Sequence, residues 1–289
     1  MDWKLTAAVV LTSLSGTSGA SNENVRDDTT RIISQIQRAD YQGDQATLKK
    51  LYDALTPFAE DAQLASRVRY WRGFDMWRRA VNGFNDSVDA SELEQDLKVA
   101  VEEFREAITK DPGFVDAKIG LISCLGYMAF INRQHQAHAE ELVSQILPLV
   151  DELKNMAPDN PRFLWVIGPI LWNSPPERGG GQDKAIENYK RGLELCSKIK
   201  ASEDPLEPSW GKPELMMSLA YSYANKETPD VEAAERNARA ALEIVPYWHY
   251  VRDILLPQIL AKRAKASSSL SKASMNTPNP IVQTRKKAP

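Results

Sequence analysis

The fold of this chain can be predicted from one stretch, Ala100-Val-Glu-Glu-Phe104-Arg-Glu-Ala107-Ile-Thr-Lys-Asp-Pro112. Ala100, Phe104 and Ala107 are spaced so that they share one face of a helix. Small residues on this face allow a neighbouring helix to approach closely, and the aromatic ring fills the space beyond. Pro112 cannot continue the helix but suits the first turn of the next one. The stretch therefore predicts a helix that packs closely against a neighbour and is followed directly by another helix.

The same pattern returns twice further along the chain. It is present as Ala185-Ile-Glu-Asn-Tyr189-Lys-Arg-Gly192-Leu193 and, more weakly, as Ala234, Ala238 and Ala241-Leu242 before Pro246. Apolar residues recur at three- and four-residue spacing through the whole body, and runs of alternating strand-like residues are absent from the sequence. A regular series of helices without strands predicts stacked helical hairpins rather than one globular bundle.

This pattern resembles the second helix and closing proline of the tetratricopeptide repeat (TPR), whose unit is about 34 residues long. Three large–small pairs also match the first helix of that repeat: Ile119-Gly120, Ile167-Gly168 and Leu219-Ala220. Gly73 with Met76 fits an earlier copy. The resemblance implies an all-α fold, a right-handed α-solenoid of TPR-like helix hairpins, with about four repeats within residues 61–246.

The chain departs from the family pattern at three places. The third pair ends Leu153-Lys-Asn-Met-Ala-Pro158 without the small–aromatic–small face, residues 175–182 are an insertion, and residues 201–212 form a long lead-in to the last pair. Three further features are similar to a subgroup of exported bacterial TPR-containing proteins of mostly unknown role: Asn160-Pro161-Arg162, Gly179-Gly180-Gly181 and Trp210-Gly211-Lys212.

Additional segments flank the repeats. We expect a degenerate helical pair in residues 21–60 and a capping helix in residues 247–266, which would cover the last exposed apolar face, as the ends of a solenoid require. Residues 1–20 are predicted to be a signal peptide, because Lys4 precedes a short apolar run and small residues end at Ala20. Residues 267–289 are predicted to be a disordered basic tail, with weak contact to an anionic surface as an alternative role.

The composition excludes several functional classes. The chain has 289 residues, with 36 Lys and Arg against 39 Asp and Glu, a formal net charge of −3. Seven basic residues and no acids lie between Ala261 and Pro289, which leaves −10 for the rest of the chain and disfavours nucleic acid as a partner. Two cysteines exclude a disulfide-rich scaffold and a four-cysteine zinc site. Nothing after the start of the chain predicts a transmembrane helix.

Few residues in the sequence suggest chemistry, and for each one a structural role is favoured. His135 and His138 share a helix face, where ligation of a metal would need a nearby carboxylate such as Glu140 or Glu141. Cys124 and Cys196 lie in different predicted repeats, so whether they pair is left open, and two buried thiols are favoured. Gly179–Gly181 lacks the Lys-Ser/Thr ending of a phosphate loop. We favour a structural loop over an anion site there. We therefore predict no catalytic residues, no metal and no cofactor.

The concave face is the remaining candidate site. In TPR proteins the first helix of each pair forms most of this surface, and aromatic and arginine side chains are enriched at binding hot spots. The register of the resemblance implies a partner-binding groove lined by Arg67, Tyr70, Phe74, Trp77, Arg78, Arg162, Trp165, Trp172, Asn173, Met217, Tyr221 and Asn225. The third pair presents Phe114, Ala117, Leu121 and Cys124 and is expected to be covered by a neighbouring segment or another subunit.

These observations favour a non-catalytic scaffold of the cell envelope, periplasmic or secreted, that binds a peptide or protein partner in the groove. The alternative is an accessory, transporter-associated TPR protein that holds a small apolar ligand. An enzyme would require a site that the motifs do not reveal.

Overall fold

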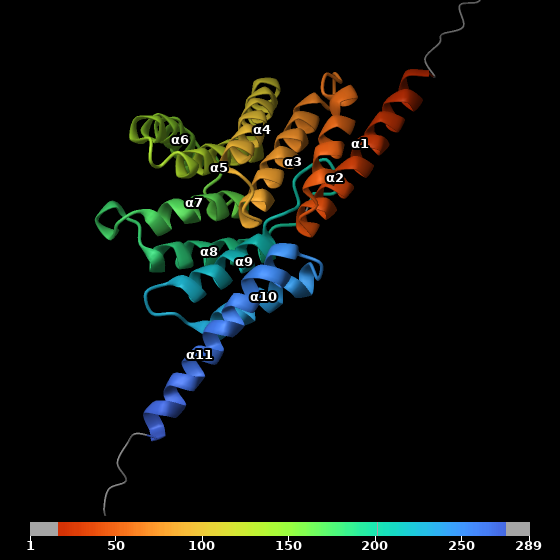
Figure 1. Cartoon of the computed structure of the whole chain (residues 1–289). Helices are drawn as coiled ribbons and strands as arrows, with labels where there is room; N and C mark the ends of the chain where they lie inside the picture. The colour runs from red at the N-terminus through yellow and green to blue at the C-terminus, as the bar shows by residue number, and fades with distance from the viewer. Residues whose placement is uncertain (1–16, 201, 276–289) are drawn as a thin grey trace, which may run out of the picture.

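The computed structural model describes residues 17–200 and 202–275, in which every regular element is a helix (Figure 1). Two helices come first: α1 (Thr17–Gln42) and α2 (Gln45–Ala54), followed by the short 3₁₀ turn η1 (Thr56–Phe58). The four predicted repeats are observed as four hairpins: α3 (Ala65–Asn85) with α4 (Ala90–Lys110), α5 (Val115–Ile131) with α6 (Gln136–Met156), α7 (Pro161–Asn173) with α8 (Gln182–Lys198), and α9 (Lys212–Asn225) with α10 (Val231–Ile244). The predicted all-α solenoid is confirmed.

The small–large–small face stacks the hairpins. The ring of Phe104 on α4 lies between two glycines, with its nearest atoms 3.0 Å from the position that a Cβ would take on Gly73 and 2.3 Å from that position on Gly120. Tyr189 on α8 packs against Gly168 in the same way, at 2.1 Å. Ala100, Phe104 and Ala107 are all fully buried. Because glycine has no Cβ, each of these positions on one helix leaves room for an aromatic ring on another helix, and this contact sets the distance between hairpins.

The second hairpin is attached differently. Consecutive hairpins meet closely where α4 packs on α5 and where α8 packs on α9, but α6 makes no comparable packing with α7 in the described chain. Leu147 and Val143 on α6 remain 58% and 42% exposed. The physical reason is the missing small–aromatic–small face at the end of this pair, without which the next helix has no surface into which it can fit.

The curvature of the array brings its two ends together. The Tyr41 hydroxyl, at the end of α1, donates a hydrogen bond to Glu214 Oε1 on α9 at 2.6 Å. The ring of Tyr41 also meets that of Trp248 edge to face, with centroids 5.0 Å apart. Nearby, His249 Nε2 lies 3.0 Å from Asp86 Oδ1, which follows α3. The helices that precede the repeats therefore pack against the helices that end them.

The last apolar face is covered by residues that follow α10. A π-helical segment, η3 (Tyr250–Leu255), leads into α11 (Leu256–Met275), and Val251, Leu255 and Ile259 are buried against α9 and α10. The helix continues past Ser267, the first residue of the predicted disordered tail, to Met275, and no glycine or proline follows Pro257 within it. The rest of the predicted tail and residues 1–16 of the predicted signal peptide lie outside the described residues. None of the described helices has the length and hydropathy needed to cross a membrane.

Candidate binding site

The first helices of all four hairpins line a pocket of about 370 Å³ on the inner face of the solenoid. Helix α3 provides Arg78 and Asn82, α5 provides Ser123 and Tyr127, α7 provides Trp165 and Trp172, and α9 provides Met217 and Tyr221. Trp248 and Tyr250, which follow α10, complete the wall. We call this space the inner pocket. Side chains that are distant in sequence meet here because each first helix turns the same face inward.

Six of the twelve sequence-predicted groove residues line the inner pocket: Arg78, Trp165, Trp172, Asn173, Met217 and Tyr221. Tyr221 is the most exposed of the aromatic residues among them, at 46%, whereas Trp165 is 8% exposed. The indole Nε1 of Trp165 donates to Ser218 Oγ at 2.8 Å, which fixes the orientation of the ring. One wall of the pocket is therefore the fixed ring of Trp165, and its rim includes the more exposed ring of Tyr221.

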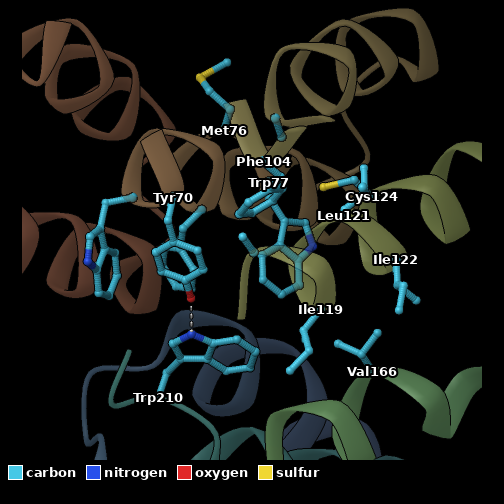
Figure 2. Close-up of a cluster of buried hydrophobic side chains, with 14 of the residues drawn as sticks. Tyr70, Met76, Trp77, Phe104, Ile119, Leu121, Ile122, Cys124, Val166 and Trp210 are labelled. Carbon is cyan, nitrogen blue, oxygen red and sulfur yellow. Dashed lines mark hydrogen bonds between the residues drawn. The ribbon is translucent and has the colours of Figure 1, made fainter. Parts of the chain in front are cut away.

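Three other predicted groove residues, Tyr70, Phe74 and Trp77, are core residues. Figure 2 shows Tyr70 and Trp77 in this cluster. Trp210 lies over them, with its Nε1 donating to the Tyr70 hydroxyl at 2.8 Å and its ring centroid 5.6 Å from that of Trp77. Because Trp210 covers this part of α3, these side chains stabilise the fold and are not accessible to a partner. Sequence position alone places them on the first helix but does not reveal what covers them.

The covering chain is residues 202–211, which we call the inner segment. It lies in the lead-in before α9 and folds back over α3, where Leu206 O accepts a hydrogen bond from Trp71 Nε1 at 2.7 Å. Leu206 is 1% and Trp210 6% exposed. The part of the expected groove over Tyr70, Phe74 and Trp77 is thus filled by the chain itself.

The remaining predicted groove residues are held by other parts of the chain. Arg67 forms ion pairs with Asp111 at 2.6 Å and with Glu207 of the inner segment at 2.7 Å. Arg162 forms a two-pronged pair with Asp116, in which Nη2 lies 2.9 Å from Oδ2. Asn225, although exposed, accepts a hydrogen bond from Lys262 of α11 at 2.8 Å. The two arginines therefore hold the framework around the inner segment.

The floor of the inner pocket carries a buried ion pair. The Nε of Arg78 donates to Asp40 Oδ1 at 2.8 Å, and the two side chains are 4% and 2% exposed. Asn82 Nδ2 donates to the same carboxylate oxygen at 3.0 Å and to the Asp40 carbonyl at 3.0 Å. Glu214 also lies nearby, and burial raises its pKa. A positive group is therefore fixed at the pocket beside acidic side chains.

The pocket walls themselves are uncharged at neutral pH. Burial raises the pKa of the hydroxyls of Tyr127, Tyr189 and Tyr250, so these groups stay protonated and can donate hydrogen bonds. The lining combines apolar rings with hydroxyl and amide groups. Such a surface suits an uncharged ligand that has both an apolar part and hydrogen-bonding groups.

Comparison with solved structures gives a likeness in fold. No protein-family model matches the chain, and no curated protein matches its sequence significantly. The solved structure of TTC0263, a thermophilic TPR protein in Thermus thermophilus, is similar with a TM-score of 0.50 at 16% sequence identity. The match covers 85% of this chain and 99% of that chain. The fold is that of TPR proteins. At this identity the likeness concerns the fold, and the features of the pocket come from this chain.

Several residues that line the inner pocket were not among the predicted groove residues. Tyr127 lies on α5, on the hairpin that we expected to be apolar and covered. Continuing the spacing of Leu121 and Cys124 by three residues reaches it, so the register contained the signal. Phe84 and Phe130, 42% and 49% exposed, form the outer rim together with Tyr127. Trp248 and Tyr250 come from beyond the TPR hairpins, and no repeat register could have placed them.

The other candidate residues lie outside the inner pocket. His138 Nδ1 is 3.5 Å from Glu141 Oε2, and the described residues contain no group of three side chains that could hold a metal. Cys124 is buried and Cys196 half-buried, and both are free thiols. The N–H groups of Gly179, Gly180 and Gly181 donate to carbonyl oxygens at 2.9, 3.2 and 2.9 Å, as a structural turn requires, which leaves them unavailable to an anion.

Proposed function

We propose that this protein is a non-catalytic interaction scaffold that binds a partner polypeptide at the inner pocket. The observation that carries the proposal is the convergence of the four first helices on one aromatic pocket. Aromatic and arginine side chains dominate the binding energy of protein interfaces, and they do so in well-packed, desolvated pockets. The TPR fold supports the same function, because it presents this kind of concave surface.

Affinity capture with the purified protein tests the proposal. Trp172→Ala and Tyr221→Ala remove side chains that line the pocket without belonging to the fully buried core. Leu147→Ala is the matched control, because Leu147 is 58% exposed on α6 and lies outside the pocket. We expect the affinity for the partner to fall about tenfold or more in both pocket variants, as on loss of a hot-spot side chain, and to be unchanged in the control. Unchanged partner binding by both pocket variants would refute the proposal.

A small apolar ligand is the second candidate function, and the size of the pocket favours it. Small-molecule sites have volumes of about 300–1,000 Å³, and the inner pocket, at about 370 Å³, lies within that range. Thermal unfolding with a panel of uncharged lipophilic compounds tests this candidate. A concentration-dependent rise in the midpoint that is absent from Trp172→Ala supports it, and no rise for any compound argues against it.

We also propose that the protein acts in the cell envelope after export. The support is the apolar run after Lys4 and the small residues that end at Ala20. Fusing residues 1–24 to an alkaline phosphatase that is active only after export tests this location. Activity of the fusion, and its loss when Val9 and Val10 are both replaced by Asp, is the expected result. An inactive parent fusion would contradict export.

A further inference from the structure

The inner pocket contains unused hydrogen-bond donors on a buried charged side chain. Within the described chain, the one hydrogen bond that Arg78 donates runs from Nε to Asp40. Its two Nη groups have no protein acceptor within hydrogen-bonding distance among the described residues, although the side chain is only 4% exposed and lines the pocket. Neither Nη is among the buried side-chain atoms that lack a partner, so both donors reach the accessible surface of the pocket, where an acceptor on a ligand can take the place of water.

The surroundings of Arg78 determine which acceptor fits. Asp40 already neutralises the guanidinium at 2.8 Å, and Glu214 is close enough to act on it electrostatically. A second carboxylate in this space would therefore be repelled by like charges in a poorly solvated site. A neutral carbonyl oxygen accepts the same hydrogen bonds without that repulsion. The floor of the pocket thus favours an uncharged acceptor over an acid.

The walls determine what accompanies the acceptor. Trp165 and Trp172 come from α7 and Tyr127 from α5, and all three line the same space. Aromatic rings pack edge to face or offset against one another, with a gain beyond that of burial alone. A volume of about 370 Å³ accommodates one large side chain with its neighbouring main chain rather than a length of polypeptide. The inner segment closes the continuation of the groove over α3.

We propose that the inner pocket recognises one aromatic residue of a partner polypeptide, with its side chain among Trp165, Trp172 and Tyr127 and its main-chain carbonyl bound by the Nη groups of Arg78. This inference rests on the proposed function and specifies its partner. The specificity is for an internal residue of the partner, because a carboxyl terminus would place a charge beside Asp40. The pocket selects a neutral carbonyl over a carboxylate because Asp40 already balances the charge of the Arg78 guanidinium.

Three small compounds test the inference on the unaltered protein. All three share the ring and an acetyl group. N-acetylphenylalanine methylamide also has the residue's own carbonyl in a neutral amide, N-acetylphenylalanine has a carboxylate in its place, and N-(2-phenylethyl)acetamide lacks this second carbonyl. Binding is followed at neutral pH by NMR through the indole N–H signals of Trp165 and Trp172. We expect the methylamide to bind most tightly and the compound without the second carbonyl to bind about tenfold or more weakly, as for a hydrogen bond to a charged group.

Variants then assign the effect to Arg78. Arg78→Lys keeps the charge beside Asp40 but loses the fork of Nη donors, so the preference for the methylamide over the compound without the second carbonyl narrows severalfold. Arg105→Lys, on the outer side of α4 against Gln145, is the control and retains the full preference. Because the compound series uses the unaltered protein, the test does not depend on the folding of the Arg78 variant.

The outcomes separate the inference from the proposed function. Equal binding of the three compounds, tighter binding of the carboxylate, or no change in either indole signal would overturn the recognition of a neutral aromatic residue. In that case, if Trp172→Ala still weakened binding of the captured partner, the proposed scaffold function would remain supported. Conversely, the expected order of the compounds with no partner dependent on the pocket would support the recognition and count against the scaffold.

Discussion

The ring of Phe104 occupies the place that a side chain on Gly120 would fill. Its Cζ lies 2.3 Å from the position of a Cβ on Gly120, and the glycine belongs to the next hairpin. The contact joins α4 to α5 and is part of the buried aromatic cluster around Tyr70 and Trp77 (Figure 2). A pattern recognisable in the sequence is therefore a direct packing contact between repeats.

Gly120→Ala is expected to destabilise the protein by about 1–3 kcal/mol, because the new methyl group overlaps a rigid ring in a packed core. Gly126→Ala is the matched control on the same helix, where a Cβ meets no atom within 4 Å. It should gain up to about 1 kcal/mol from the higher helix propensity of alanine. Urea unfolding followed by circular dichroism measures both. Equal effects of the two substitutions would show that the ring does not restrict position 120.

Asp40→Ala is expected to cost about 3–5 kcal/mol, because it leaves the Arg78 guanidinium buried without its counter-charge. The pair joins α1 to α3 at 2.8 Å. Asp28→Ala provides the comparison, since its pair with Arg31 is exposed, at 2.6 Å, and contributes about 1 kcal/mol or less. Chemical denaturation at neutral pH checks the difference. A loss below about 1 kcal/mol for Asp40→Ala would contradict the buried pair.

Because Asp75 is buried without hydrogen-bond partners, we expect it to lower the free energy of unfolding as pH rises. It is fully buried on α3, neither carboxylate oxygen has a hydrogen-bond partner, and burial followed by the charge of Asp40 raises its pKa well above the usual value. The folded state therefore holds its proton while the unfolded state releases it above about pH 4, so this group costs stability increasingly as pH rises. Asp75→Asn removes that cost.

The expected result for Asp75→Asn is a stability equal to or slightly below that of the parent near pH 4 and above it at pH 7. Urea unfolding across this range, with parent and variant measured in the same buffers, gives the difference between them. All other titrating groups cancel in that difference. A gap that stays constant from pH 4 to pH 7 would show that Asp75 ionises normally in the folded protein.

His249, where the two ends of the array meet, predicts a second loss of stability with rising pH. Its pKa is raised by hydrogen bonds to Asp86, which follows α3, and to Asp253 on η3, each at 3.0 Å. The stabilisation is fully present below the unfolded pKa of about 6.5 and is lost as pH rises through the higher folded value. His249→Gln should therefore lose most relative to the parent near pH 5.5 and least near pH 8.5. A pH-independent difference in unfolding free energy would exclude this linkage.

The fold could be predicted because its determinants are local. The spacing of Ala100, Phe104 and Ala107 lies on one helix, and the glycine that receives the ring is in the next helix along the chain. Each repeat contacts mainly its neighbours, so a short pattern repeated several times specifies the whole array. The weak packing of α6 was marked in the same way, by the absence of the pattern near Leu153.

The candidate site could be predicted only in part. The repeat register placed Trp165, Trp172 and Tyr221 at the inner pocket, because register follows from helical spacing. It gave no indication that Trp210 covers Tyr70, since these residues are separated by 140 positions and no periodic pattern connects them. The same holds for Trp248 and Tyr250, which reach the pocket only because the two ends of the array meet.

Spacings of three and four residues along the chain are enough to specify the helices, their pairing and the face that each first helix turns inward. How much of that face stays open depends on the folded molecule, because a segment without regular pattern folds back over part of it. The charge at the pocket floor depends on the fold in the same way. There Asp40 of α1 meets Arg78 of α3, which is distant in sequence, and leaves the Nη donors of the arginine at the space that remains.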